Sequence, residues 1–277
     1  MAFGYGRMMT PLEWWLSFAA LGAFVGFFAG MLGIGGGAIM VPPLVFLLDA
    51  QGLPKDQVLH LAVGTSMATI LLTSLSSVRA HHARGAIRWD IMRGMTPGIL
   101  LGGLAGAALA SHIPTAALAL AFTLIIFGAA TSMILNRAPS PSRQLPGALS
   151  LGGVGAAIGG VSSLAAMGGA FISVPYMVRC NVPMIQAIGT AASLGFPIAL
   201  AGTAGFIISG LYLYDSGLPP GSLGFVYLPA FAGITITSVL IAPVGAAIAH
   251  RLPTRRLKQI FALLLYVLAV RMVIKIW

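Results

Sequence analysis

Long apolar stretches follow one another along almost the whole chain, and they limit what it can fold into. Eight of them approach the roughly 20 mostly apolar residues that a helix needs to cross a bilayer. Only 7% of the residues are charged, against about 25% in a typical soluble domain, so polar groups could not cover a globular surface. The sequence therefore predicts an all-α polytopic membrane protein with about eight transmembrane segments, at 12–32, 58–78, 94–112, 115–135, 147–166, 183–209, 223–249 and 257–276.

The second half of the chain repeats the first. Three stretches recur in the same order: GMLGIGGGAIMVPPLV (30–45) as SLAAMGGAFISVPYMV (163–178), AVGTSMA (62–68) as AIGTAAS (187–193), and GAALASHIPT (106–115) as GAAIAHRLPT (245–254). Matches that keep their order indicate an internal duplication. We expect a first transmembrane repeat over 1–135, a basic, proline-rich linker over 136–147, and a second transmembrane repeat over 148–277.

Loop charges indicate how the two repeats are oriented, because cytoplasmic loops are enriched in Lys and Arg. Segment 79–93 carries four arginines and its counterpart 210–222 carries none, whereas 111–115 lacks basic residues and its counterpart 250–258 has four. An inverted arrangement puts 11 of the 15 basic residues inside, and a parallel one divides them almost evenly. We therefore expect inverted-topology repeats, with broken or re-entrant helices supplying the odd number of crossings. Parallel repeats of four simple spans are the alternative.

The stretch GIGGGAIMVP (33–42) interrupts an apolar segment with four glycines in five residues. Each glycine costs about 1 kcal/mol relative to alanine inside a helix. The stretch is no nucleotide-binding loop, because a P-loop ends in Gly-Lys-Ser/Thr and a dinucleotide fingerprint follows a strand. The break recurs as MGGAFISVP (167–175). Paired breaks are typical of inverted-repeat transporters, in which half-helices point free N–H groups at an anion near the bilayer midplane.

Other glycines are spaced by four residues, which predicts close packing of helices. They are Gly22, Gly26 and Gly30 in one segment and Gly98, Gly102 and Gly106 in another.

The residues around the two breaks form the predicted substrate-binding site. Backbone N–H groups there would hold an anion, hydroxyl groups of the Gly-Thr-Ser and Gly-Thr-Ala motifs would add hydrogen bonds, and the two halves would rock to alternate access. No carboxylate lies deep in a span, which weighs against a cation pathway. The predicted set is Gly33, Gly35, Gly36, Gly37, Pro42, Gly64, Thr65, Ser66, Met167, Gly168, Gly169, Pro175, Gly189 and Thr190.

His60 lies one turn before the Gly-Thr-Ser motif and is a candidate for proton coupling, although it is also near a loop. No paired carboxylates or nucleophile motif lies within a span. We therefore expect no enzyme activity, no cofactor and no metal site.

At these residues the sequence resembles the sulfite exporter TauE/SafE family of membrane transporters. The resemblance rests on GIGGGAIMVPPL (33–44), AVGTSMA (62–68) and their copies at 166–175 and 187–193, and it covers nearly the whole chain. It implies a multi-pass permease of a bacterial inner membrane that moves sulfite, organosulfonates or related small anions, often outward. The family's members differ in substrate, so the resemblance does not fix which anion is moved.

The second copy of the break departs from the first. Ala166 stands where the first copy has Gly33, Met167 where it has Ile34, and Ala170 where it has Gly37. We therefore expect an asymmetric pocket with less backbone freedom on the second side.

The expected partners are a small anionic substrate and the lipid bilayer. The net charge of +10 does not indicate nucleic acid, because the basic residues lie in short loops between apolar segments. A homodimer is left open. Alternatives to the anion transporter are a channel-like or carrier permease for another small organic solute and an integral-membrane enzyme.

Overall fold

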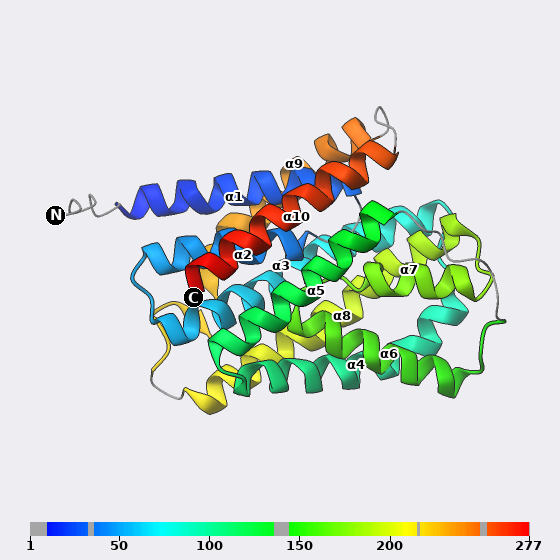
Figure 1. Ribbon diagram of the computed structural model, residues 1–277, viewed down its shortest axis with the longest axis horizontal. Coiled ribbons are helices and arrows are strands. Elements are labelled where there is room, and N and C mark those ends of the chain that lie inside the picture. Colours follow the sequence, from blue (N-terminus) through cyan, green and yellow to red (C-terminus); the bar gives the residue numbers. More distant parts are fainter. Residues whose placement is uncertain (1–9, 33–35, 136–143, 215–216, 250–253, 277) are drawn as a thin grey trace.

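The computed structural model describes residues 10–32, 36–135, 144–214, 217–249 and 254–276, and these are mostly helical (Figure 1). The helices of the first half are α1 (Pro11–Leu32), α2 (Gly37–Ala50), α3 (Lys55–Ala83), α4 (Trp89–His112) and α5 (Thr115–Leu135). Those of the second half are α6 (Ala148–Leu164), α7 (Ala170–Arg179), α8 (Met184–Leu213), α9 (Leu228–Ala249) and α10 (Thr254–Ile276).

The prediction of an all-α polytopic membrane protein agrees with these helices. Six of them, α1, α3, α4, α5, α8 and α9, are long and apolar enough to cross a membrane. The apolar parts of α2, α6 and α10 are shorter. Large apolar side chains face outward, and Leu101, Leu240 and Leu263 are 71%, 68% and 64% exposed. The total of eight spans stays a prediction, as does the division into two repeats joined by the 136–147 linker.

The segment predicted at 223–249 differs from the structure at its start. A short antiparallel hairpin precedes the helix, with β1 (Ser222–Leu223) paired to β2 (Val226–Tyr227). Its turn places Gly224 at a φ of 54°, a left-handed conformation that glycine adopts at little cost. Phe225, at the tip, is fully buried. The hairpin is therefore inserted into the bundle, and α9 begins only at Leu228.

Two helix pairs form the long edges of the molecule. α1 packs along α9 and α4 packs along α6, with α3 and α8 between the pairs (Figure 1). Glycines permit both contacts, as their spacing predicts, because a Cβ would overlap the neighbouring backbone. The contacts are Gly22 with Ile234, Gly26 with Ser238, Gly98 with Gly152, Gly102 with Ala156 and Gly106 with Gly160. The surroundings of Gly30 lie outside the described part of the chain.

The helices α3 and α8, which carry the matching Gly-Thr motifs, pack together in the centre of the bundle. Gly64 faces Phe206, and Gly202 faces Met67. Further along, Gly195 faces Ser74. As the residue number rises along α3 it falls along α8, so the two helices run antiparallel.

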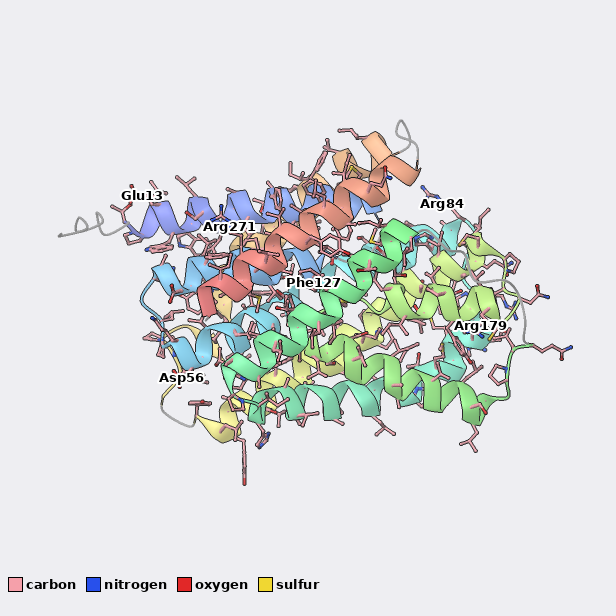
Figure 2. All side chains as sticks on the ribbon, viewed as in Figure 1. Glu13, Asp56, Arg84, Phe127, Arg179 and Arg271 are labelled. Atoms are coloured by element: carbon pink, nitrogen blue, oxygen red, sulfur yellow. The ribbon has the colours of Figure 1, made fainter. Side chains whose placement is uncertain are left out.

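Charged side chains mark the two ends of the bundle. Arg84, after α3, and Arg179, at the end of α7, lie at one end, whereas Glu13 and Asp56 lie at the other (Figure 2). The helices α5 and α10 cross the bundle between these ends (Figure 1), and the hydroxyl groups of Thr131 and Tyr266 lie 2.5 Å apart where they meet.

Candidate functional site

The two breaks have the same backbone geometry. Gly36 precedes α2 with φ 64° and ψ −13°, and Gly169 precedes α7 with φ 73° and ψ −11°. The two glycines occupy matching positions in the duplicated stretch. An L-residue with a side chain adopts this left-handed conformation only with strain, which explains a glycine at both positions. Neither helix receives a hydrogen bond from a capping side chain.

The structure brings the two breaks into contact. Gly37, the first residue of α2, lies against the carbonyl oxygen of Ala166 and against the end of the Ile70 side chain. A Cβ at Gly37 would overlap that oxygen. The break of the first half, the break of the second half and the middle of α3 therefore meet at one point.

The second break has a hydroxyl group where the first has a methyl group. Beside Gly36 lie the side chains of Ala29 and Val25. Beside Gly169 lie Ser162, which is equivalent to Ala29, together with Ile158 and Ile198. The α7 side of the candidate site is therefore more polar.

Three buried serines have hydroxyl groups that no described residue satisfies. Ser66 of α3 and Ser162 and Ser163 of α6 are at most 1% exposed, and their Oγ atoms make no hydrogen bond within the described part of the chain. A buried hydroxyl without a partner costs free energy, so these groups can donate to a bound ligand. Ser66 was in the predicted set. Ser162 and Ser163 were missed, although they directly precede the second break.

Thr65 and Thr190 each bind the backbone of the loop that precedes α9 or α4, the fourth helix of the second and of the first half. The Thr65 hydroxyl accepts a hydrogen bond from the N–H of Tyr227, just before α9, at 2.9 Å. The Thr190 hydroxyl accepts one from the N–H of Arg88, just before α4, also at 2.9 Å. Tyr227 and Arg88 occupy matching positions in the two halves. Each threonine therefore has a structural role that links the two halves.

The glycines that precede these threonines contact the same two loops. Gly64 of α3 lies against the carbonyl group of Phe225, and Gly189 of α8 lies against the carbonyl group of Ala86. Phe225 and Ala86 are again matching residues. A side chain on either glycine would overlap the loop that packs against it. Each Gly-Thr pair therefore packs against, and hydrogen-bonds to, a loop of the other half.

The remaining predicted residues lie near the breaks or outside the described part. Pro42 is buried within α2, and Pro175 is half-buried within α7, so both helices continue through their prolines. Met167 is buried, and its N–H donates to the carbonyl oxygen of Ser162 at 3.0 Å. Gly168 lies near Gly195 of α8. Gly33 and Gly35 lie outside the described residues.

His60 is separate from the breaks. It is 4% exposed and lies near the start of α3, whereas the breaks contact Ile70 further along that helix. Its ring packs against that of Phe225, with centroids 5.2 Å apart.

A cleft of about 460 Å³ lies where α4 begins, beside the residues that precede α6, and it contains no predicted site residue. At its rim Asp90 pairs with Arg88, and this hydrogen bond raises the pKa of the Arg88 guanidinium. Within the described ranges, no group of three or more His, Cys, Asp or Glu side chains is placed to hold a metal ion. The cleft is lined by Asp90, Ile91, Arg93, Gly94, Leu145, Pro146, Ala148 and Leu151.

Comparison with known proteins points to membrane transport. The profile of the family described as sulfite exporter TauE/SafE matches residues 18–272. A probable membrane transporter protein of Haemophilus influenzae is 36% identical over 258 residues, which are 92% of this chain and 96% of that protein. One from Methanocaldococcus jannaschii is 25% identical over 231 residues, 81% and 80% of the two chains. No solved structure matches the chain.

Proposed function

Because the chain belongs to the sulfite exporter TauE/SafE family, we propose that it is a secondary transporter of small anions, sulfite or an organosulfonate. It would work by alternating access in a bacterial inner membrane. The observation that carries this proposal is the meeting of the two matching half-helix starts, with the buried Ser162 hydroxyl, which has no partner within the described chain, beside Gly169.

The chemistry of this meeting point favours an anion. The N-terminal ends of α2 and α7 carry partial positive charge and N–H groups that lack side-chain caps. Beside Gly169, the Ser162 hydroxyl adds a neutral donor. A sulfonate stays ionised at physiological pH, so its site must stabilise charge with donors and cannot rely on protonating the substrate.

The proposed architecture is a pair of inverted repeats. Antiparallel contact between α3 and α8 supports it, since equivalent helices of parallel repeats would run in the same direction. The charges support it too, because Arg84 and Arg179, which an inverted arrangement puts inside, lie at the same end of the bundle (Figure 2). Inverted repeats place a shared site between their broken helices, where we put the substrate.

Flux measurements on purified protein in lipid vesicles test the proposal. We expect labelled sulfite or methanesulfonate to cross the membrane with the wild type. Gly36→Val and Gly169→Val should abolish this flux, because a β-branched residue neither adopts their left-handed backbone readily nor fits the space beside them. Membrane insertion should remain.

Gly128→Val is the matched control. Gly128 is exposed in α5 and has no neighbour that a Cβ would meet, so flux should persist. Anion flux that survives both Gly36→Val and Gly169→Val would show that the site is elsewhere. A carrier of neutral solutes would take up its solute without inhibition by sulfite or sulfonates.

A further inference from the structure

The ring of His60 faces backbone carbonyl oxygens on both sides. Nδ1 lies 3.1 Å from the carbonyl oxygen of Asp56, one turn earlier in α3. Nε2 lies 3.1 Å from the carbonyl oxygen of Ala110 and 3.2 Å from that of Ile113, where α4 ends. The histidine thus links the start of α3 to the turn between α4 and α5.

Carbonyl oxygens only accept hydrogen bonds, and this restricts the state of the ring. A neutral imidazole has one N–H donor and one lone pair, whereas the imidazolium has two donors. With acceptors at both nitrogens, a neutral ring must set one lone pair against a carbonyl oxygen. Only the protonated ring can donate on both sides, so the imidazolium is the form that would satisfy all of these carbonyl oxygens.

Two further features favour the positive charge. Ala110 and Ile113 lie at the C-terminal end of α4, where the helix carries partial negative charge. The face of the Phe225 ring, 5.2 Å from that of His60 and tilted by 31°, attracts a cation. Burial opposes the charge, so the proton is bound reversibly and its occupancy depends on the surroundings.

The charged and titratable groups around the ring are few within the described chain. The Asp56 carboxylate, exposed one turn earlier, attracts the proton, and exposed Lys55 opposes it. From α4, His112 is exposed and directs its Nδ1 to the carbonyl oxygen of Ala108. From α5 comes only the neutral Thr115, whose hydroxyl donates to the Asp56 carbonyl oxygen at 2.7 Å. The Phe225 segment adds the neutral Tyr227.

We propose that His60 is a reversible proton-binding site whose protonated ring donates at once within the start of α3 and to the end of α4, and that this proton is coupled to anion movement. The coupling part rests on the proposed function. When the proton leaves, one nitrogen gains a lone pair that faces a carbonyl oxygen, and one of the two attachments is lost. The second half has Ile185 at the matching position, 76% exposed, so only the first half carries this device.

Nitrogen NMR of the full-length protein, with ¹⁵N-labelled histidine rings, tests proton binding directly. The His60 signals are identified by their loss in His60→Gln. We expect both nitrogens of His60 to be protonated at the acid end and one to lose its proton between about pH 5 and about pH 8, the range in which histidines change charge. A ring that keeps a single protonated nitrogen throughout this range would overturn the proposal.

Transport in vesicles tests the coupling. We expect anion movement by the wild type to be accompanied by a change of internal pH, and a proton gradient to drive accumulation of sulfite or methanesulfonate. His60→Gln should lose both effects but keep the exchange of labelled for unlabelled anion, because its amide still donates to the end of α4. The exposed His112→Gln should behave like the wild type.

The two proposals fail in different ways. If His60→Gln retains gradient-driven accumulation, His60 is not the coupling site although the protein is an anion transporter. If the ring titrates but the wild type moves no anion, proton binding stands and the proposed function falls.

Discussion

The two breaks share a backbone but differ in their surroundings. Most of α2 is buried, including the run from Gly37 to Pro42, whereas Ser173, Met177 and Val178 are the buried residues of the shorter α7. The first break is enclosed by apolar side chains, and the second lies beside hydroxyl groups. The two halves therefore share the left-handed helix starts and differ in the side chains that line them. Gly36 is flanked by the apolar side chains of Ala29 and Val25, whereas Gly169 has the Ser162 hydroxyl beside it.

One residue of the second break has a strained backbone. Ala166, which stands where the first copy has Gly33, has a φ of 47°. This left-handed conformation costs an L-residue roughly 1–2 kcal/mol, and the fold holds it nevertheless. The reduced backbone freedom expected on the second side stays a prediction, because Gly33 lies outside the described residues.

Of the substitutions that compare the two breaks, Gly37→Val should lower stability most. Its side chain would meet the backbone carbonyl group of Ala166, which cannot rotate away, so we expect unfolding free energy to fall by about 3 kcal/mol or more. The matching Ala170→Val adds to a residue that already has a Cβ and should cost only about 0.5 kcal/mol. Thermal unfolding of the purified proteins in detergent measures both. Equal losses would mean that the breaks do not depend on the Gly37 contact.

Thr65→Val and Thr190→Val come next and test whether the two crossing loops are held alike. Each removes the acceptor of a backbone N–H and should cost about 1–3 kcal/mol. Thr→Ser at either position keeps the acceptor and should restore most of the stability in the same unfolding assay. If only one of the two Thr→Val substitutions lowered stability, the two loops would not be held in the same way.

Ser162→Ala should affect binding and leave the fold intact. Because its Oγ has no partner within the described chain, removing it should not lower stability. If the hydroxyl donates to the anion, affinity for sulfite or methanesulfonate should fall about tenfold, equivalent to about 1.4 kcal/mol. Concentration-dependent flux measures this, with the exposed Ser76→Ala as the control. Unchanged affinity would remove Ser162 from the site and with it the polar character of the second break.

Ala166→Gly should change stability least, and it should raise stability where the other substitutions lower it or leave it unchanged. Relief of the left-handed strain, roughly 1–2 kcal/mol, should outweigh the loss of one buried methyl group, about 0.8 kcal/mol. We expect stability to rise by less than about 1 kcal/mol, visible as a small increase in melting temperature. A decrease would show that packing of the methyl group matters more than the backbone conformation.

The helices were largely predictable from the sequence, because each is a long apolar run bounded by turn residues. The segment 115–135 agrees residue for residue with α5. The hairpin before α9 was not predictable, since Leu223 and Phe225–Tyr227 continue an apolar run and the burial of Phe225 depends on packing against α3 and α8. That packing arises only when Gly64 and Phe206 face each other.

The candidate site was predictable only where it depends on local sequence, and not where it depends on tertiary packing. A glycine that starts a half-helix is a local feature, so Gly36 and Gly169 could be identified from their motifs. Whether a serine has a partner depends on distant packing. Ser162 and Ser163 therefore had no signal beyond their place before the break. The loop-holding role of Thr65 and Thr190 likewise depends on residues 162 and 102 positions away.

The packing of α1 on α9 and of α4 on α6 has a consequence for how the molecule can move. Each of these pairs joins a helix of the first half to one of the second through glycines that let the backbones approach closely. In addition, each half binds a loop of the other half through its Gly-Thr pair. Displacing one repeat against the other as a rigid body would break all of these contacts at once. We therefore expect the mobile units to combine helices of both halves, α1 with α9 and α4 with α6, in place of the rocking of one half against the other that was expected from the sequence.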